Sequence, residues 1–498
     1  MKKMLFFAGL IIFFGVTVLF IGIQQSAAQG TKVNFVISTD NPKPLHQEVY
    51  GFNTNMATGD YAYSDKSIVD ITTRLKPIVL RFPGGTVANQ YHWQLSGFKR
   101  EEMMDADSKK ERERNIRNLE KLQERRKGVL SFDEFMTLCN KLNIRPILVV
   151  NLFTGTPSES AAWVKQVKEK GYKVFGWELG NELYLPSYRN KIKNFSEYIN
   201  VARKHAQAMK AVDPKVRLAV VGHPGAFDLL DAKRVASSDR WNETLGKENF
   251  FDAYTAHMYV KVNDFFGEKP DINDNLKTGL FEVTDAMFDR AVKTYGNAFK
   301  GKELWVTEWN LMFFDSKEMA DTLLHAMYCG DFFISMVNTD IITNSDYHVL
   351  AGPWNGFPLI SATKDPDEHT KRACYHSFDV MKDAMTASHK KFSVKVENNP
   401  FLKKSNKYTS NPVMGISAAS VGTQRKTFIL IANRTSDDIP ANITLNNSRI
   451  TGKVKYSYVS AGSLQSKGEN NKIEVKTISD MADKLVLPSN SFGVIEIL

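Results

Sequence analysis

Two glutamates are the residues of this sequence best suited to chemistry. Glu182 lies in "GWELGNELYL", residues 176–185, and Glu308 lies in "VTEWN", residues 306–310. Two carboxylates about 5–5.5 Å apart can hydrolyse a glycosidic bond with retention, one as nucleophile and one as acid and then base. The acid needs a raised pKa, whereas the nucleophile must stay ionised. Glu178, four residues before Glu182, is predicted to be scaffold that points into the interior.

The fold must therefore bring residues 182 and 308 together. Between residues 45 and 385, short apolar runs alternate with amphipathic helical segments, which predicts a (β/α)8 TIM barrel. A doubly wound open sheet is the alternative, but no glycine-rich phosphate loop follows any of the runs. The eight predicted strands are "EVYGFN", "PIVLRFPGG", "RPILVVN", "KVFGWELGNE", "VRLAVVG", "FFDAYTAHMY", "ELWVTEWN" and "DIITNSDYHV".

The two ends of the chain differ from this pattern. Residues 386–498 alternate apolar and polar residues between turns, which predicts a C-terminal antiparallel β-sandwich. Residues 29–44 contain one more strand, which we expect to join that sandwich. Residues 1–28 combine "MKK", about 20 apolar residues and a small-residue cleavage site, as in a signal peptide. The apolar run could also span a bilayer as an uncleaved membrane anchor. Either reading predicts a secreted, periplasmic or cell-surface protein.

Polar and aromatic side chains gather where the predicted barrel strands end. In a TIM barrel these carboxyl-terminal strand ends line the active site. Donors such as Arg81 and the Tyr259 hydroxyl would keep a nucleophilic carboxylate ionised. Aromatic rings such as Trp309 would stack on sugar faces. The residues that we expect to bind substrate are Asn55, Arg81, Asn151, Asn181, His257, Tyr259 and Trp309.

Several other classes of function fit the sequence poorly. HExxH motifs, cysteine clusters and calcium-loop spacing are missing, so neither a metal nor a cofactor is expected. A Ser-His-Asp hydrolase is disfavoured because no G-x-S-x-G motif is present. The net charge of +10 is spread along the chain among acidic residues, which argues against a nucleic-acid partner. Cys139, Cys329 and Cys374 allow at most one disulfide and are interpreted as buried small side chains.

A set of ordered motifs resembles one known family. "LRFPGGTVANQYHW", "GWELGNE", "HMY" and "VTEWN" are similar to motifs of the family 51 α-L-arabinofuranosidases, within glycoside hydrolase clan A. The resemblance covers about residues 45–385 and implies that Glu182 is the acid/base and Glu308 the nucleophile. It also implies that Asn181 binds the sugar hydroxyl next to the anomeric carbon, and that Arg81 and Tyr259 hold the nucleophile.

Two positions depart from the family pattern. Asn55 stands where the family has a sugar-binding glutamate, and Thr86 stands where an asparagine usually follows Pro-Gly-Gly. The expected function is a secreted retaining glycoside hydrolase that acts on a polysaccharide or oligosaccharide by double displacement. The alternatives are another clan A hydrolase (a β-glucuronidase, β-xylosidase or endo-glycanase), a transglycosidase, or a non-catalytic carbohydrate-binding protein. The protein could also form oligomers.

Overall fold

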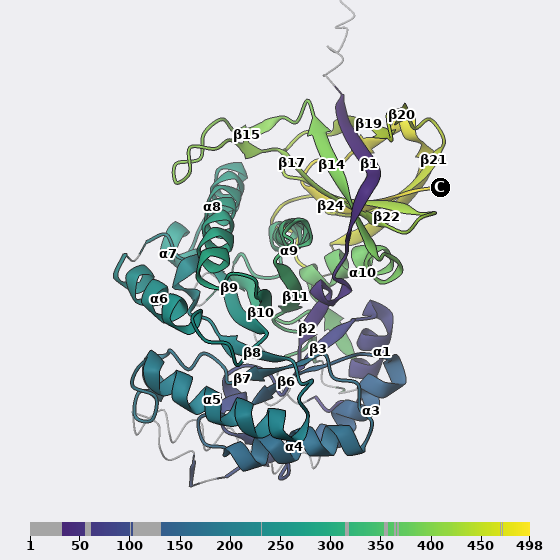
Figure 1. Ribbon diagram of the computed structural model, residues 1–498. Helices are drawn as coiled ribbons and strands as arrows, with labels where there is room; N and C mark the ends of the chain where they lie inside the picture. Colours follow the sequence, from purple (N-terminus) through teal and green to yellow (C-terminus); the bar gives the residue numbers. More distant parts are fainter. Residues whose placement is uncertain are drawn as a thin grey trace, which may run out of the picture.

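The computed structural model of the chain describes residues 32–54, 61–99, 101–102, 131–230, 232–313, 318–352, 357–362, 365, 368–468, 470 and 472–498. Two bodies are evident in Figure 1, a barrel surrounded by helices and a C-terminal sheet domain. Within the described ranges, no helix combines the length and apolarity needed to cross a bilayer. The expected signal segment, residues 1–28, lies outside these ranges.

Eight parallel strands close into a barrel in the order β10-β11-β2-β3-β6-β7-β8-β9. Each strand overlaps one of the eight runs predicted from the sequence, and β9 and β10 continue two residues past theirs, so the predicted TIM barrel is confirmed. The short strands are buried along their whole length, as expected for a parallel sheet covered on both faces. Their bounds are β2 Gly51–Asn53, β3 Val79–Phe82, β6 Ile147–Val150, β7 Gly176–Leu179, β8 Leu218–Val221, β9 Ala253–Lys261, β10 Glu303–Met312 and β11 Ile342–Tyr347.

Helices surround the barrel, and several begin at a residue whose side chain caps the first turn. The Oγ1 of Thr156 accepts from the backbone N–H of Glu159, and Pro157 follows as the first helical residue. The α-helices are α1 Lys66–Leu75, α3 Phe132–Leu142, α4 Pro157–Glu169, α5 Phe195–Val212, α6 Ala232–Leu245, α7 Val262–Phe266, α8 Asp274–Ala298, α9 Leu323–Asn338 and α10 Ala373–Ala387. The 3-10 helices are η1 Gln47–Val49, η3 Thr86–Asn89, η5 Pro186–Tyr188, η6 Pro224–Phe227 and η7 Ala482–Lys484.

The C-terminal domain is a ten-stranded sheet in which every pairing but one is antiparallel. The exception is β1 (Val33–Pro44), which pairs parallel with β19 and antiparallel with β14, so the N-terminal strand lies inside this domain. The sheet order is β20-β19-β1-β14-β17-β18-β24-β21-β22, and β23 pairs with β19. The other bounds are β14 Lys390–Glu397, β17 Ile416–Gly422, β18 Thr427–Asn433, β19 Ile439–Leu445, β20 Ser448–Arg449, β21 Lys453–Ser460, β22 Glu474–Met481, β23 Val486–Leu487 and β24 Ser491–Ile497.

This sheet curls around its own core. Phe35 on β1, Ile443 on β19, Tyr456 on β21 and Ile495 on β24 belong to one buried cluster, although β19 and β21 lie near opposite ends of the strand order. The predicted C-terminal sandwich is therefore built from one hydrogen-bonded sheet that folds over itself. Short two-stranded ribbons complete the described structure: β4 Tyr91–His92 with β5 Gly97–Phe98, β12 Ile360–Ala362 with β13 His369–Lys371, and β15 Phe401–Lys403 with β16 Val413–Met414.

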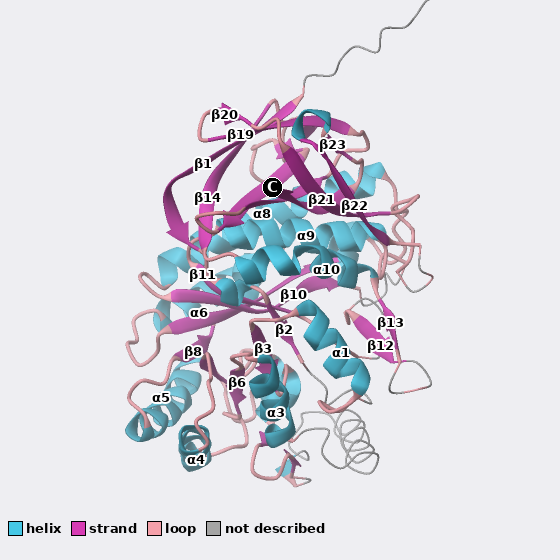
Figure 2. Cartoon of the chain, turned by 90° about the vertical axis from the view of Figure 1, so that its right-hand side faces the viewer, coloured by secondary structure: helices cyan, strands magenta, loops and turns pink. Residues whose placement is uncertain are grey.

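Helices α9 and α10 join the two bodies. Figure 2 shows both helices between the barrel and the sheet domain. Almost every residue of α9 is buried, as expected for a helix with protein on all sides. A Cβ on Gly330 of α9 would lie 2.2 Å from the ring of Phe492 on β24, so glycine is needed for this close approach.

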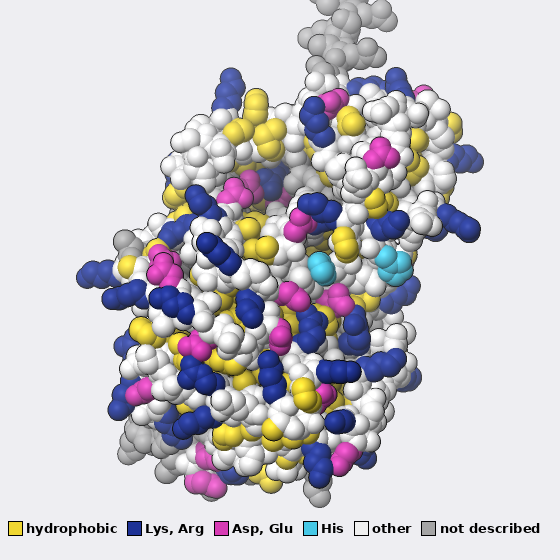
Figure 3. All heavy atoms as spheres, viewed as in Figure 1, with side chains coloured by type: hydrophobic (Ala, Val, Ile, Leu, Met, Phe, Trp, Pro, Cys, Tyr) yellow, Lys and Arg dark blue, Asp and Glu magenta, His cyan; other side chains and the backbone are white. Residues whose placement is uncertain are grey.

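Charged groups are mixed on the surface. On the face in Figure 3, Lys and Arg side chains are spread over both bodies and alternate with Asp and Glu. This distribution agrees with the spacing of charges along the sequence.

Candidate active site

Arg81, at the end of β3, is the centre of the site. Its guanidinium is fully buried and donates three hydrogen bonds to three different side chains. Nε donates to Glu178 Oε2 at 2.6 Å, one terminal nitrogen to Glu308 Oε1 at 2.8 Å, and the other to Asn181 Oδ1 at 2.8 Å. Arg81 thereby links the fourth strand of the barrel, β7, to the seventh, β10. Glu178 is buried and also accepts from the Thr307 hydroxyl, as expected for scaffold inside the barrel.

An irregularity in β10 aims Glu308 into the barrel mouth. The register of β10 shifts just before Glu308 against β9, and around it against β11. Because of the shift, Thr307 and Glu308 both contact interior groups, whereas regular alternation would send one of them outward. Glu308 Oε2 accepts a hydrogen bond of 2.7 Å from the Tyr259 hydroxyl, which β9 places beside it. The carboxylate of Glu308 is therefore held at both oxygens.

The surroundings of Glu308 stabilise its ionised form. Burial would raise the pKa of this carboxyl, but the charges of His257, His348 and Arg81 and the Tyr259 hydrogen bond outweigh it. The pKa falls to about 2. Glu308 is a carboxylate at any pH near neutrality, which a nucleophile requires.

Glu182 reaches the same space from the end of β7. The chain turns sharply after this strand, with a positive φ of 89° at Gly180 and of 47° at Glu182 itself. Glycine adopts such a conformation without strain, whereas a glutamate there is unusual and is found where structure imposes it. Glu182 Oε1 lies 2.9 Å from both the Tyr184 hydroxyl, which donates to it, and His257 Nδ1. Its side chain keeps 22% of its surface exposed, against 8% for Glu308.

His257 lies close to both carboxylates, Glu182 and Glu308. Its Nδ1 lies 2.9 Å from Glu182 Oε1 and 3.6 Å from Glu308 Oε2. The separation of Glu182 Oε1 and Glu308 Oε2 therefore cannot exceed the sum of these two distances. A separation this short fits the close carboxyl pair of a retaining glycosidase better than the wider pair of an inverting one. Burial would lower the pKa of His257, but Glu308 and Glu182 raise it, so the protonated ring is favoured.

Asn181 is fixed from two sides and keeps one donor for a ligand. Its backbone N–H donates to Asn89 Oδ1 and its backbone carbonyl accepts from Asn89 Nδ2, at 2.9 and 2.6 Å. Its side-chain oxygen accepts from Arg81, and its buried Nδ2 has no partner within the described part of the chain. An unpaired buried donor is costly unless something occupies it. A substrate hydroxyl beside the carboxylates would do so.

Glycine is required where the loop after β3 passes the site. A Cβ on Gly85 would lie 2.8 Å from Glu308 Oε1 and 3.9 Å from Asn181 Oδ1. The second glycine of the Pro-Gly-Gly motif therefore lets the backbone approach Glu308.

Three residues expected at the site are not found among these contacts. The Asn151 side chain is paired with the Oγ1 and the N–H of Thr154 and so stabilises its own loop. Trp309 was expected to stack on sugar, and this is wrong, because the ring is 1% exposed and packs outside the barrel against Phe332 of α9 and Phe378 of α10. The shift that turns Glu308 inward turns its neighbour outward. Asn55 lies outside the described residues.

Four contributors lie outside the set of residues that we expect from the sequence to bind substrate. They are Gly85, Asn89, Tyr184 and His348, whose Nδ1 lies 3.8 Å from Glu308 Oε2. Asn89 lies in η3, three residues after Thr86. The side chain of Asn89 is buried and its amide contacts Asn181, whereas Thr86 is exposed. Tyr184 follows Glu182 by two residues, a spacing that could have indicated contact within a tight turn.

A cleft opens from the Glu182 side of the site. It encloses about 820 Å³ of empty space, part of which is open solvent. Glu182 borders it but Glu308 does not. Its lining is largely apolar, with a few charged groups, and consists of Glu182, Tyr184, Leu185, Pro224, Phe227, Asp228, Leu230, His257, Tyr259, Lys261, Asp264, Phe265, Met287 and Met312.

Comparison with curated proteins finds arabinofuranosidases. α-L-Arabinofuranosidase C of Emericella nidulans is 26% identical over 245 residues, which are 45% of this chain and 46% of that protein. The intracellular exo-α-(1→5)-L-arabinofuranosidase of Acetivibrio thermocellus is 22% identical over 281 residues, 52% of this chain and 51% of that protein. The chain thus spans about half the length of the curated relatives it matches. No protein-family model matches the chain.

Solved structures share the whole architecture. The family 51 arabinofuranosidase of Xanthomonas axonopodis pv. citri superposes with a TM-score of 0.70 at 14% identity, covering 94% of this chain and 100% of that one. A family 44 xyloglucanase of Paenibacillus polymyxa gives 0.60 at 11% identity, covering 93% and 99%. The barrel with a C-terminal sheet domain is the fold of these enzymes. Together with the curated relatives, these likenesses confirm the resemblance to family 51.

Proposed function

We propose that the protein is a retaining glycoside hydrolase that removes α-L-arabinofuranosyl groups from an oligosaccharide or polysaccharide. The observation that carries the proposal is the carboxylate pair, Glu182 and Glu308, which approach the same nitrogen of His257 from two strands of the barrel. The arabinose specificity rests on the relatives, whose names describe arabinofuranosidases.

The two carboxylates differ in the way that double displacement requires. Glu308 is buried, ionised and held by Arg81 and Tyr259, so it is the nucleophile that attacks the anomeric carbon. Glu182 is more exposed and borders the cleft, so it is the acid that protonates the leaving oxygen. The contacts of each side chain support both assignments.

The reaction then runs in two steps. In the first, Glu308 forms a covalent bond to the sugar while Glu182 gives its proton to the departing group, which leaves through the cleft. In the second, Glu182 takes a proton from water, and that water releases the sugar from Glu308 with the original anomeric configuration. Asn181 Nδ2 would bind the hydroxyl next to the reacting carbon in both steps, since it is the buried donor beside Glu308.

The test combines two active-site variants with azide. Glu308→Gln should abolish turnover of an aryl α-L-arabinofuranoside, by at least about 10³-fold, because the covalent step is lost. Glu182→Ala should lose most activity on poor leaving groups, and azide should restore turnover by giving an arabinosyl azide of retained configuration. The matched control is Glu169→Gln, which removes an exposed carboxylate on α4 and should leave the rate unchanged.

The outcomes separate the rival functions. An azide product or a first-formed sugar of inverted configuration, read by NMR, would refute double displacement. Turnover of aryl xylosides, glucosides or glucuronides in place of arabinofuranosides would keep the mechanism and change the sugar. Binding of sugar by folded protein without turnover would support the non-catalytic alternative, and transfer to an added sugar acceptor would support a transglycosidase.

Export from the cytoplasm is a further part of the proposal. It is supported by the sequence of residues 1–28 alone. Fractionation of the producing cell, with N-terminal sequencing of the recovered protein, would decide between a cleaved signal, an anchored form and an intracellular enzyme.

A further inference from the structure

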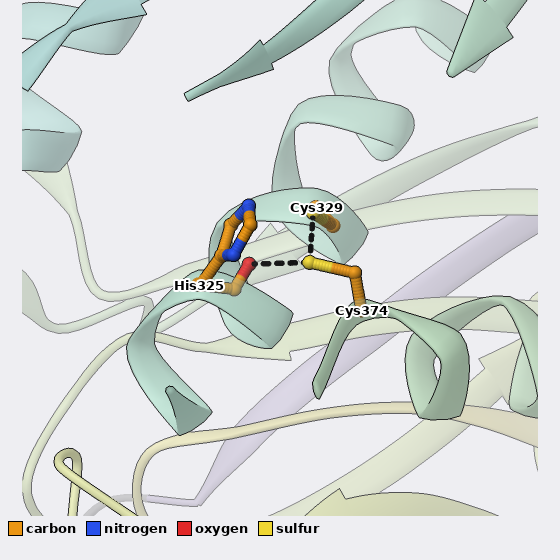
Figure 4. A group of neighbouring side chains, drawn as sticks. All are labelled: His325, Cys329 and Cys374. Atoms are coloured by element: carbon orange, nitrogen blue, oxygen red, sulfur yellow. Dashed lines mark hydrogen bonds between the residues drawn. The ribbon is translucent and has the colours of Figure 1, made fainter. Parts of the chain in front are cut away.

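Two of the three cysteines meet in the helical layer behind the barrel. Cys329 on α9 and Cys374 in the first turn of α10 have their sulfurs 2.8 Å apart, and both side chains are buried. Figure 4 shows the two sulfurs facing each other across the gap between the helices, with His325 one turn before Cys329. The mechanism proposed above uses neither thiol.

A metal site is the first alternative to consider. One ligand atom each from His325, Cys329 and Cys374 could be drawn within 4.8 Å of the others. Two thiolates on one tetrahedral zinc ion, each with a bond of about 2.3 Å, would keep their sulfurs about 3.8 Å apart. The observed contact is much shorter. His325 Nε2 lies 2.7 Å from Asn310 Oδ1, whereas its Nδ1 has no partner among the described residues, so the distance between the two sulfurs decides between the alternatives. The geometry therefore favours a direct bond between the sulfurs over a shared ion.

We propose that Cys329 and Cys374 form a disulfide that ties α9 to α10. The two residues come from different, adjacent helices and their sulfurs already touch, so only a small side-chain movement is needed. Cys139, the remaining cysteine, is buried on α3 and stays a free thiol.

The two thiols differ in the folded chain, where Cys374 is the more acidic. Burial would raise the pKa of its thiol, but the hydrogen bond to Cys329 and the neighbouring His325 lower it below the usual range for cysteine. A position in the first turn of a helix also favours the thiolate. Burial raises the pKa of Cys329 well above its ordinary value, so Cys374 is the more acidic thiol of the packed pair.

The reaction needs an external disulfide as oxidant, such as oxidised glutathione or an oxidised dithiol protein. The thiolate of one of the two cysteines attacks one sulfur of that disulfide, which gives a mixed disulfide and releases one thiol. The other cysteine then loses its proton and attacks the cysteine sulfur of the mixed disulfide, which releases the second thiol. The protein loses two electrons and two protons, and the oxidant becomes two thiols. Since both sulfurs are buried in the folded chain, this exchange takes place before α9 and α10 have packed.

The bond would secure the part of the barrel that carries Glu308. Helix α9 follows β10 and α10 follows β11, and both helices also contact the sheet domain. The cross-link would close a loop between residues 45 positions apart, which restricts the unfolded chain. We expect the oxidised protein to unfold at a temperature about 5 °C higher than the reduced one.

Peptide mapping tests the proposal directly. The full chain is produced both in the oxidising bacterial periplasm and in the reducing cytoplasm, and each sample is unfolded in the presence of iodoacetamide. In the periplasmic protein we expect a 329–374 cross-linked peptide pair, two hydrogens lighter than the two thiols, and alkylation of Cys139 alone. Reduction in denaturant should expose all three thiols, whereas the same reductant should leave the bond intact in the folded protein.

Each other outcome contradicts the proposal. Three alkylated cysteines in folded periplasmic protein would overturn it, and so would a cross-link that includes Cys139. One metal ion per chain in native mass spectrometry, lost on alkylation of Cys329 and Cys374, would assign the cluster to a metal instead. The control variant Cys139→Ser should keep the cross-link, and Cys374→Ser should lose both the cross-link and the difference in unfolding temperature between oxidised and reduced protein.

Discussion

Arg81 and Glu178 form an ion pair without solvent exposure, with 2.6 Å between Nε and Oε2. The same guanidinium binds Glu308, so the position of the proposed nucleophile depends on a scaffold carboxylate that substrate does not reach. Charges buried in this way are stable only when each is paired and hydrogen bonded. Glu178 and Glu182 are four residues apart but have different surroundings. Glu178 lies inside the barrel, paired with Arg81, and Glu182 lies at the barrel mouth.

Glu178→Gln should destabilise the protein more than it changes substrate binding. The substitution keeps the size of the side chain but leaves part of the Arg81 charge unpaired. Breaking a buried pair costs about 3–5 kcal/mol, and we expect the free energy of unfolding to fall by an amount near the lower end of that range. Urea denaturation measures the loss, and the exposed Glu169→Gln serves as control. Equal stability of the two variants would show that Glu178 does not balance Arg81.

Tyr259→Phe should shift the acid limb of activity to higher pH. The lowered pKa of Glu308 keeps this carboxylate ionised as the pH falls, down to about pH 2. Its contribution to stability is present above the ordinary pKa of a glutamate and is lost as the pH falls through the lowered one. Removal of the 2.7 Å hydrogen bond raises the pKa, so both activity and stability fail at higher pH than in the wild type.

The size of the Tyr259→Phe effect follows from the bond that is lost. A hydrogen bond to a charged group is worth about 1.5–3 kcal/mol, which predicts a decrease in kcat/KM of about 10- to 100-fold. The pH dependence of kcat/KM is the measurement. A uniform decrease with an unchanged acid limb would mean that Tyr259 positions substrate and does not hold Glu308 ionised.

The sequence predicted the barrel and the carboxylate pair because both depend on local patterns. Apolar runs of four to six residues mark buried parallel strands, and strand ends mark the mouth of a barrel. Trp309 shows the limit of this reasoning. Its direction depends on a register shift in β10, which involves pairing with β9 and β11 and has no local signature. Asn89 reaches the site from the 3-10 helix η3, whose path the strand pattern does not describe, whereas His348 directly follows β11 within the run "DIITNSDYHV".

Gly85→Ala should reduce activity without unfolding the protein. The added methyl group would lie 2.8 Å from Glu308 Oε1, so the carboxylate or the loop must move. A displacement of this kind at the nucleophile should lower kcat by at least about tenfold. The matched control is Gly452→Ala, since a Cβ there meets nothing within 4 Å among the described residues. Wild-type kcat in Gly85→Ala would show that the loop yields and that Glu308 keeps its place.

Arg434→Met should loosen the contact between the barrel helices and the sheet domain. Arg434 follows β18 and binds Asp285 on α8 and Asp331 on α9, at 2.9 and 2.6 Å, and its side chain is only 5% exposed. The substitution leaves the buried Asp331 and the partly exposed Asp285 without their cation, and removing one partner of a buried pair costs about 3–5 kcal/mol. By comparison, Lys426→Met breaks a solvent-exposed pair with Glu496 and should cost less than about 1 kcal/mol.

Two measurements distinguish this role from a general effect on folding. Calorimetry should show one unfolding transition in the wild type and in Lys426→Met, whereas Arg434→Met should unfold at a lower temperature. Hydrogen exchange of Arg434→Met should show that the amide hydrogens of the sheet domain exchange first. Adding Asp331→Asn to Arg434→Met should recover part of the loss, because one unpaired charge is removed. If the double variant were less stable than Arg434→Met, Asp331 would be held by its other contact, the Ser417 hydroxyl, and not chiefly by Arg434.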